Sequence, residues 1–200
     1  MSDVSEILMR LKSTAILLLV GILSVPFSGC ISPSCGDNEQ CENDNDGYTD
    51  IQDDIDQWTG TTFPDFDLMD TEGINWTNEN FSGELWIAYF SAVWCTHCET
   101  TFNSYDKAIP EGKFLAFNKD PREEYSNISE WKATTSERLE RNITRPFLHG
   151  PTLAESLDVH GIPHAFFVNG DGIIVDYTYG VQDNSTALEV RFQEHGGILN

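Results

Sequence analysis

The chain has 200 residues, enough for one folded domain with additional segments. It contains 33 acidic and 11 basic residues, which gives a formal net charge of −22, and no Lys or Arg lies between Lys12 and Lys107. Because binding to a phosphate backbone requires clustered Lys and Arg, this composition argues against a nucleic-acid-binding protein.

The first 30 residues have the pattern of a targeting segment. Arg10 and Lys12 precede the apolar run AILLLVGILSV, which is about eleven residues long. A membrane-spanning helix needs ~20 apolar residues, so this run suits the apolar region of a secretion signal. The following FSGC resembles a bacterial lipobox, in which the cysteine, here Cys30, is lipidated. Residues 1–30 are therefore predicted to be a signal peptide with a lipobox, an ordinary cleaved signal or an uncleaved membrane anchor, and each of these places the rest of the chain outside the cytoplasm.

Residues 31–60 are predicted to form an acidic linker. Cys35 and Cys41 bracket a short loop and are expected to pair as a small disulfide in an oxidising compartment. The stretch from Glu42 to Asp53 has the spacing of a calcium loop, with Gly47 at the sharp turn. The candidate oxygen ligands are Glu42, Asp44, Asp46, Asp50 and Asp53. The loop resembles those of thrombospondin type 3 repeats and dockerins, although it begins with Glu and ends with the shorter Asp, unlike an EF-hand. The alternative is a disordered tether that binds no calcium.

Residues 61–200 are predicted to form the folded domain. The segment FPDFDLMDTEGINWT alternates apolar and polar residues and turns at Glu72-Gly73, which indicates a β-hairpin. The apolar run Leu85–Phe90 is typical of a strand buried on both faces. A helix is expected from Cys95 to Ile109, because Pro110 and Gly112 would end it.

The second half of this domain continues with a strand, a helix, a hairpin and a final helix. The helix at Ser129–Arg141 is amphipathic, with Ser129 as its candidate N-cap. The hairpin HAFFVNGDGIIVDYTYG turns at residues 169–172, whose side chains tolerate positive φ. The strand at Lys113–Asn118 precedes these elements and the helix at Ser185–Glu194 follows them. The order predicts an α/β fold with a mixed sheet.

Cys95 and Cys98 form a CxxC motif at the expected start of a helix, and this pattern has several interpretations. A structural zinc site needs four ligands, and the domain offers one such pair. Haem attachment needs a His directly after the second cysteine, where this chain has Glu99. A cysteine at a helix N-terminus is favoured as the reactive thiolate, so Cys95 is the candidate nucleophile and Cys98 the candidate resolving thiol. A structural disulfide is the alternative.

The combination of a buried strand, Trp94 before the CxxC motif, a helix and a later Gly-Ile-Pro resembles the thioredoxin superfamily. The stretch FPDFDLMDTEG…NFSGELWIAYFSAVWCTHC resembles its extracytoplasmic TlpA/ResA-like branch, and the resemblance extends from Phe63 to His195. It implies a three-layer α/β fold, with a central mixed sheet, an N-terminal β-hairpin and helices on both faces, that needs no cofactor. It also implies a cis Ile162–Pro163 bond beside Cys95, shaping the substrate groove. Trp94 is expected either beside the active site or in the core.

Two departures from the family pattern concern acidic residues. Tyr89 replaces a buried Asp six positions before the first cysteine, and Thr101 replaces a Glu three positions after the second, so no base is assigned. His97 is expected to stabilise the Cys95 thiolate and to favour an oxidising or isomerising role, whereas Glu99 opposes it. Three further histidines lie around the proline segment and are expected at the surface, although His164 could approach the site: His149, His160 and His164.

The sequence therefore predicts a membrane-tethered, extracytoplasmic thiol–disulfide oxidoreductase that exchanges disulfides with protein substrates and with a redox partner protein. A copper metallochaperone of the same fold is one alternative, although that branch uses a CxxxC spacing. A peroxiredoxin is another, although that family has Thr three residues before its cysteine, where this chain has Ala92.

Overall fold

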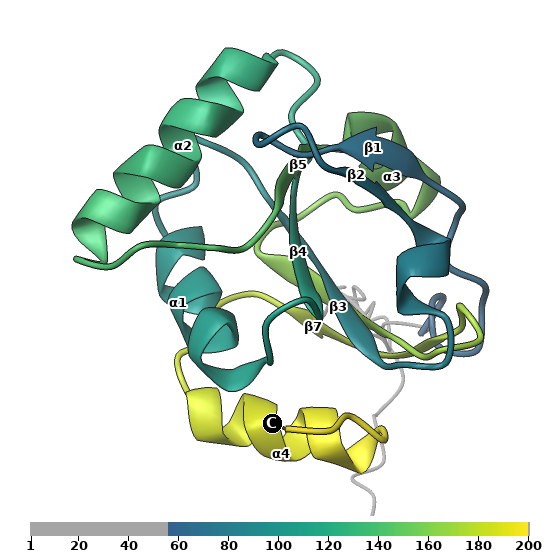
Figure 1. Ribbon diagram of the computed structural model, residues 1–200. Helices are drawn as coiled ribbons and strands as arrows, with labels where there is room; N and C mark the ends of the chain where they lie inside the picture. Colours follow the sequence, from purple (N-terminus) through teal and green to yellow (C-terminus); the bar gives the residue numbers. More distant parts are fainter. Residues whose placement is uncertain (1–55, 200) are drawn as a thin grey trace, which may run out of the picture. The chain divides into compact units, whose positions relative to one another are not determined.

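The computed structural model describes residues 56–199 (Figure 1). The predictions of lipidation at Cys30, of a Cys35–Cys41 disulfide and of a calcium loop between Glu42 and Asp53 fall outside these residues.

An N-terminal β-hairpin precedes the central sheet, as the sequence predicts. Strands β1 (Asp67–Met69) and β2 (Asn75–Thr77) pair antiparallel, and Gly73 supplies the positive φ of 84° in the turn between them. The buried Asp70 fixes this turn, because its carboxylate accepts hydrogen bonds from two backbone N–H groups of the turn and from the indole of Trp76 at 2.9 Å. A short 3₁₀ helix, η2 (Asn78–Phe81), follows.

Five strands form the central mixed sheet in the order β5-β4-β3-β6-β7. The pairs β3–β4 and β4–β5 are parallel, and the pairs β3–β6 and β6–β7 are antiparallel. All residues of the central strand β3 are buried, as expected for a run of apolar residues covered on both faces. The strands are β3 (Trp86–Ser91), β4 (Phe114–Asn118), β5 (Phe147–His149), β6 (His164–Val168) and β7 (Ile174–Tyr179).

Helices cover both faces of this sheet and give three layers (Figure 1). Side chains from α1 (Cys98–Ala108), α2 (Tyr125–Arg138) and α4 (Ser185–Glu194) pack against one face. Side chains from α3 (Pro151–Ser156) and from the segment around the N-terminal hairpin pack against the other. This is the three-layer α/β fold that the resemblance implies.

Three local predictions differ from the structure. Helix α1 begins at Cys98 rather than at Cys95, because residues 92–97 form turns. Helix α2 begins at Tyr125 with Glu124 in a capping box, so Ser129 lies inside the helix, where its hydroxyl donates to the Tyr125 carbonyl. Strand β5 and helix α3 were not expected, since three and six residues are too few to display a periodic pattern.

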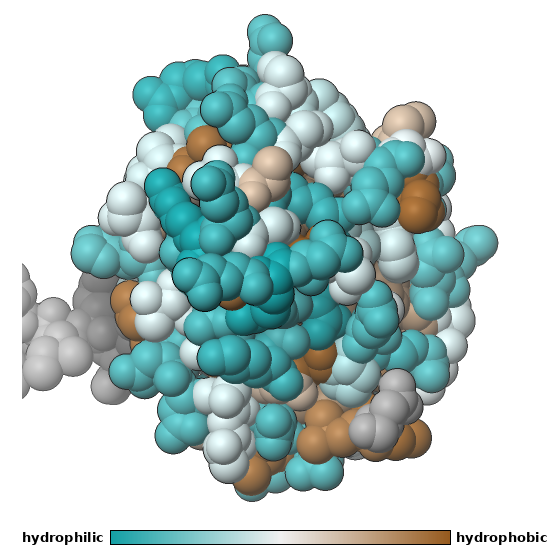
Figure 2. All heavy atoms as spheres, turned by 60° about the vertical axis from the view of Figure 1, so that its left-hand side comes forward, coloured by the Kyte–Doolittle hydropathy of each residue, from teal (hydrophilic) through white to brown (hydrophobic). Residues whose placement is uncertain are grey.

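The described domain starts within the segment expected to be linker. The indole of Trp58 donates to the Leu157 carbonyl at 2.7 Å and packs against the core on the α3 face. The face that carries α1 and α2 is mostly hydrophilic, and the broadest apolar area in this view lies at its lower right edge (Figure 2). Between residues 56 and 199, no helix combines the length and apolar character needed to cross a membrane.

Candidate active site around Cys95 and Cys98

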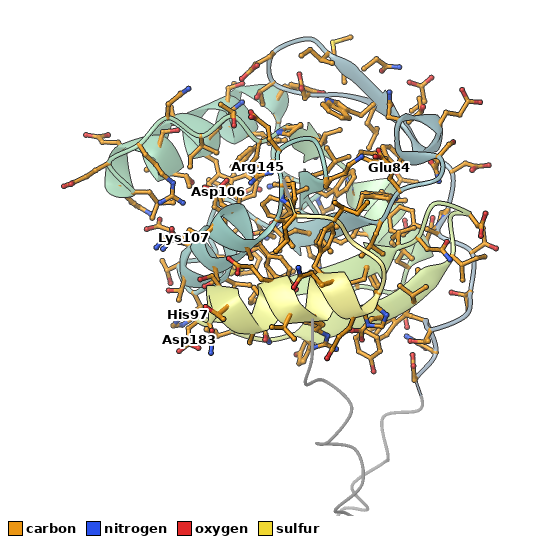
Figure 3. All side chains as sticks on the ribbon, turned by 60° about the horizontal axis from the view of Figure 1, so that its bottom comes forward. Glu84, His97, Asp106, Lys107, Arg145 and Asp183 are labelled. Atoms are coloured by element: carbon orange, nitrogen blue, oxygen red, sulfur yellow. A yellow bond between two sulfur atoms is a disulfide. The ribbon has the colours of Figure 1, made fainter. Side chains whose placement is uncertain are left out.

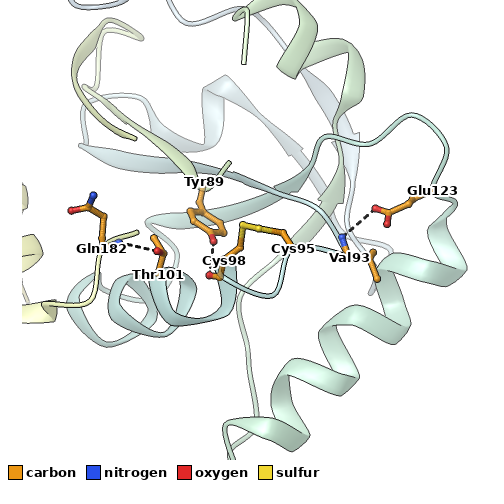
Figure 4. The surroundings of a disulfide bond; sticks show 7 residues. All are labelled: Tyr89, Val93, Cys95, Cys98, Thr101, Glu123 and Gln182. Atoms are coloured by element: carbon orange, nitrogen blue, oxygen red, sulfur yellow. Dashed lines mark hydrogen bonds between the residues drawn. A yellow bond between two sulfur atoms is a disulfide. The ribbon is translucent and has the colours of Figure 1, made fainter. Parts of the chain in front are cut away.

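Cys95 and Cys98 form a disulfide where β3 leads into α1 (Figure 4). Their Cα atoms are 5.4 Å apart. The Cys95 N–H donates to the Ala92 carbonyl at 3.0 Å and the Cys98 N–H donates to the Cys95 carbonyl at 3.2 Å, so consecutive turns bring the two sulfurs together before the helix begins. The rigid, fully buried β3 thus fixes the position of the pair.

The two cysteines differ in accessibility. Cys98 is 2% exposed and belongs to the core on the α1 face, whereas Cys95 is only half-buried. An attacking thiolate from another molecule can therefore approach Cys95 and is kept from Cys98. Cys95 also precedes the N-terminus of α1, where unpaired N–H groups and the helix dipole favour a thiolate.

Tyr89 and Thr101 both hold the site in place (Figure 4). They stand at the two positions where the proteins that the sequence resembles have carboxylates. The Tyr89 hydroxyl donates to the Cys98 carbonyl at 2.7 Å. Burial raises the pKa of Tyr89 well above its usual value, so this phenol stays protonated and acts as a donor rather than as a base. The Thr101 hydroxyl oxygen accepts from the Gln182 N–H at 2.9 Å, which ties the first turn of α1 to the loop before α4.

A loop after β4 supports the turn that precedes Cys95. The indole of Trp94 donates to the Asp120 carboxylate at 2.7 Å, and Arg122 donates to both oxygens of the same carboxylate. These hydrogen bonds from Arg122, with a smaller contribution from Trp94, hold the pKa of Asp120 far below its usual value, although its burial opposes them. Asp120 is therefore a poor proton acceptor, and its role is to position Trp94.

Glu123, in the same loop, accepts a hydrogen bond from the Val93 N–H at 3.3 Å and also bonds the Asn118 side-chain amide (Figure 4). Neither Asp120 nor Glu123 was predicted as a site residue from the sequence. Their position beside the disulfide could have been predicted, because the carboxyl ends of the parallel strands β3 and β4 lie at the same edge of the sheet. Trp94 is 58% exposed, which excludes the alternative that it belongs to the core.

His97 and Glu99 flank the second cysteine. His97 is exposed and occupies the N-cap position of α1, where its side chain makes no capping hydrogen bond. Figure 3 shows His97 at the same edge of the domain as Asp183, which precedes α4. The Glu99 carboxylate forms an ion pair with Arg138 of α2 at 2.9 Å, which offsets part of its charge beside the disulfide.

The Ile162–Pro163 bond is cis, as the resemblance implies. The Pro163 carbonyl accepts a hydrogen bond from the Gly180 N–H at 2.9 Å, so the loop before β6 is tied to the end of β7. Ile162 packs against the core on the α1 face, as Cys95 does, and also against the core on the α3 face.

The three histidines near the proline loop lie in different surroundings. His164 is 2% exposed, so the prediction that it lies at the surface is wrong, and burial with a smaller effect of Lys119 lowers its pKa to about 4. Its ring packs among Trp58 and Phe166 on the α3 face, away from Cys98. His160 is exposed and pairs with a carboxylate, whereas the ring of His149 bonds a backbone carbonyl.

Over residues 56–199, no three His, Cys, Asp or Glu side chains are grouped so that they could hold a metal ion.

The sequence matches no protein-family profile and no curated protein. The fold does match solved structures. A thio-disulfide isomerase from Thermus thermophilus superposes with a TM-score of 0.56 and 24% identity, over 70% of this chain and 99% of that one. An exposed lipoprotein thioredoxin from Streptococcus pneumoniae superposes with a TM-score of 0.55 and 21% identity, over 66% and 99%. A thioredoxin-family thiol:disulfide interchange protein from Chlorobium tepidum superposes with a TM-score of 0.54 and 18% identity, over 68% and 95%. The described domain has the thioredoxin fold.

Proposed function

We propose that this thioredoxin-fold chain is an extracytoplasmic, membrane-tethered thiol–disulfide oxidoreductase that exchanges disulfides with protein substrates through Cys95 and Cys98. A second protein would restore the redox state of the pair after each exchange. The tether is the N-terminal segment with its candidate lipidation site at Cys30. The chemistry requires no metal or organic cofactor, because the two thiols carry both electrons.

The observation that carries this proposal is the unequal accessibility of a bonded cysteine pair at a helix N-terminus. Cys95 is half-buried and Cys98 is buried. A purely structural disulfide does not require an accessible sulfur atom, whereas disulfide exchange with another protein requires one. The cis Ile162–Pro163 loop also supports the proposal, since Pro lacks an N–H group and leaves the backbone beside it to pair with an extended substrate.

In the reducing direction, the Cys95 thiolate attacks one sulfur of the substrate disulfide. A Cys95–substrate bond forms, the substrate S–S bond breaks, and the leaving substrate thiolate takes a proton. The Cys98 thiolate then attacks the Cys95 sulfur, which forms the Cys95–Cys98 disulfide and releases the second substrate thiolate. Two electrons pass from the protein dithiol to the substrate. The oxidising direction runs through the same mixed disulfide in reverse.

We favour a moderately oxidising or isomerising couple. His97 lies directly before Cys98, at the helix terminus, where a protonated imidazole would stabilise the Cys95 thiolate. Stabilising the reduced form raises the reduction potential of a dithiol. Arg138 supports the same direction, because its ion pair with Glu99 weakens the opposing negative charge.

Trapping of substrates tests the proposal. The full-length Cys98→Ala variant lacks the resolving thiol, so mixed disulfides through Cys95 should accumulate in the native cell envelope and should dissolve on reduction. The matched control is Cys95→Ala combined with Cys98→Ala, which reports adducts formed through Cys30, Cys35 or Cys41. If the two variants trap the same proteins in the same amounts, Cys95 does not exchange disulfides and the proposal fails.

A further inference from the structure

A cavity of about 480 Å³ with mainly aromatic walls lies beside the loop that carries Ile162–Pro163, here called the proline loop. It is on the sheet face opposite α1. Trp58, His164, Tyr177 and Tyr179 supply these walls, and the exposed carboxylate of Asp158 also lines the cavity. Neither the disulfide nor its supporting hydrogen bonds use these side chains.

The aromatic walls are packed against one another. The Trp58 ring centroid lies 4.8 Å from that of His164 and 4.8 Å from that of Tyr177, in edge-to-face arrangements. Tyr179 lies against the proline loop at Gly161, where a Cβ atom would come within 2.4 Å of the Tyr179 ring. Glycine at this position lets the tip of the exposed Tyr179 ring lie close against the loop and complete the wall.

His164 contributes a buried aromatic ring to this cavity. It is 2% exposed, and within the described part of the chain its Nε2 atom has no hydrogen-bond partner. Because the Nε2 atom is itself buried, a ligand in the cavity meets the ring of His164 and not this nitrogen. The imidazole is neutral near pH 7, since burial lowers its pKa to about 4, and it therefore adds no positive charge to the cavity.

The cavity is at the same end of the sheet as Cys95. Phe90, at the end of β3, pairs with His164, and the turn to Cys95 begins directly after that strand. Ile162 packs against the core cluster on the α3 face, against which the cavity residues Trp58 and Tyr177 also pack. It packs as well against the cluster on the α1 face, as Cys95 does. A polypeptide lying across the proline loop could therefore reach both places.

We propose that this cavity binds the cationic side chain, Lys or Arg, of the polypeptide that is presented to Cys95, an inference that rests on the proposed function. Aromatic faces attract a cation through their quadrupole, and Asp158 adds an opposite charge. An apolar side chain would use only the rings, and an acidic one would be repelled by Asp158.

The experiment uses peptides that carry one cysteine as a mixed disulfide with thionitrobenzoate, whose release is followed by absorbance. Lys is placed at each of the three positions on either side of the cysteine and is compared with norleucine, an apolar residue of similar length, and with Glu. The full-length reduced protein is assayed, and the rate of the Cys95→Ala, Cys98→Ala double variant is subtracted as the background from other thiols. At one position, Lys should raise the second-order rate constant of thionitrobenzoate release about tenfold over norleucine.

Variants of the cavity localise this preference, which is expressed as the ratio of the Lys to the norleucine rate. Asp158 has a φ of 56°, a conformation that Asn also tolerates, so Asp158→Asn removes the charge without backbone strain. Tyr179→Leu keeps apolar bulk but removes the aromatic face. Both should reduce the ratio to about 3 or less. Asp171→Asn, an equal charge change on the β6–β7 turn, should leave the ratio unchanged.

A ratio near 1 at every position, or a Lys preference that is equal at all positions and survives both cavity variants, would overturn the inference. The second result would instead indicate general attraction to an acidic protein. Absence of any exchange above the background, with all peptides, would refute the proposed function itself, so the two failures are distinguishable.

Discussion

Replacing His164 by Phe should remove most of the loss of stability that the protein undergoes between pH 7.5 and pH 5.0. The imidazole has its ordinary pKa of 6.5 in the unfolded chain and a pKa of about 4 in the folded protein, where it is buried. The unfolded state therefore binds the proton more tightly than the folded state. Stability due to this group is fully present above pH 6.5 and falls as the pH drops toward 4.

The size of the effect follows from the two pKa values. One unit corresponds to 1.36 kcal/mol, so the complete shift is worth about 3 kcal/mol, of which about 2 kcal/mol is lost between pH 7.5 and pH 5.0. The lower end of this pH range, pH 5.0, stays above the sequence pI of about 4.2. Phe keeps an aromatic ring against Phe166, whose centroid lies 4.5 Å from that of His164.

The assay is urea unfolding of the oxidised wild type and of the His164→Phe variant at pH 7.5, 6.5, 5.5 and 5.0. The difference in unfolding free energy between the two proteins cancels the groups that titrate in both. This difference should change by about 2 kcal/mol across the series, with the wild type losing stability faster. His164→Leu serves as the second variant if Phe does not fit. A difference that stays constant within about 0.5 kcal/mol would refute the assignment of His164 as a buried neutral imidazole.

Two further substitutions test the contacts that hold the disulfide. Tyr89→Phe should lower the unfolding free energy by about 1 kcal/mol, because the Cys98 carbonyl loses its buried donor, and an unchanged urea midpoint would contradict this contact. Asp120→Asn should cost about 1–2 kcal/mol, since the charge-assisted acceptor of Trp94 and Arg122 is lost, and it should shift the fluorescence of Trp94. If the unfolding free energy of this variant equals that of the wild type, the charge of Asp120 is not needed for these contacts.

The larger elements could be predicted from the sequence because their residues carry a strong local pattern. The apolar run that forms β3 and the turn residues between β6 and β7 are such patterns, and helix α4 has the predicted bounds Ser185–Glu194. The CxxC motif likewise predicted a Cys95–Cys98 disulfide, and the resemblance carried by Gly-Ile-Pro implied the cis Ile162–Pro163 bond. Strand β5 and helix α3 form through tertiary contacts and are too short to show a periodic pattern in the sequence.

The side-chain contacts of the site were harder to predict, because they join segments that are distant in the sequence. His164 begins a strand and looks like a surface histidine, but Trp58, from the segment expected to be linker, covers it. Nothing local to either residue indicates this packing. The pairing of Trp94 with Asp120 depends in the same way on the parallel alignment of β3 with β4.

Redox titration of the Cys95–Cys98 pair tests the central claim most directly. The full-length protein is equilibrated in glutathione buffers of increasing potential and alkylated, and the oxidation state of the peptide that contains both cysteines is read by mass spectrometry. The pair should show a single two-electron transition with a midpoint between about −120 and −180 mV, the range from a strong dithiol oxidant to a disulfide isomerase. A midpoint below about −300 mV, where structural disulfides lie, would contradict the claim that this pair is a redox reagent.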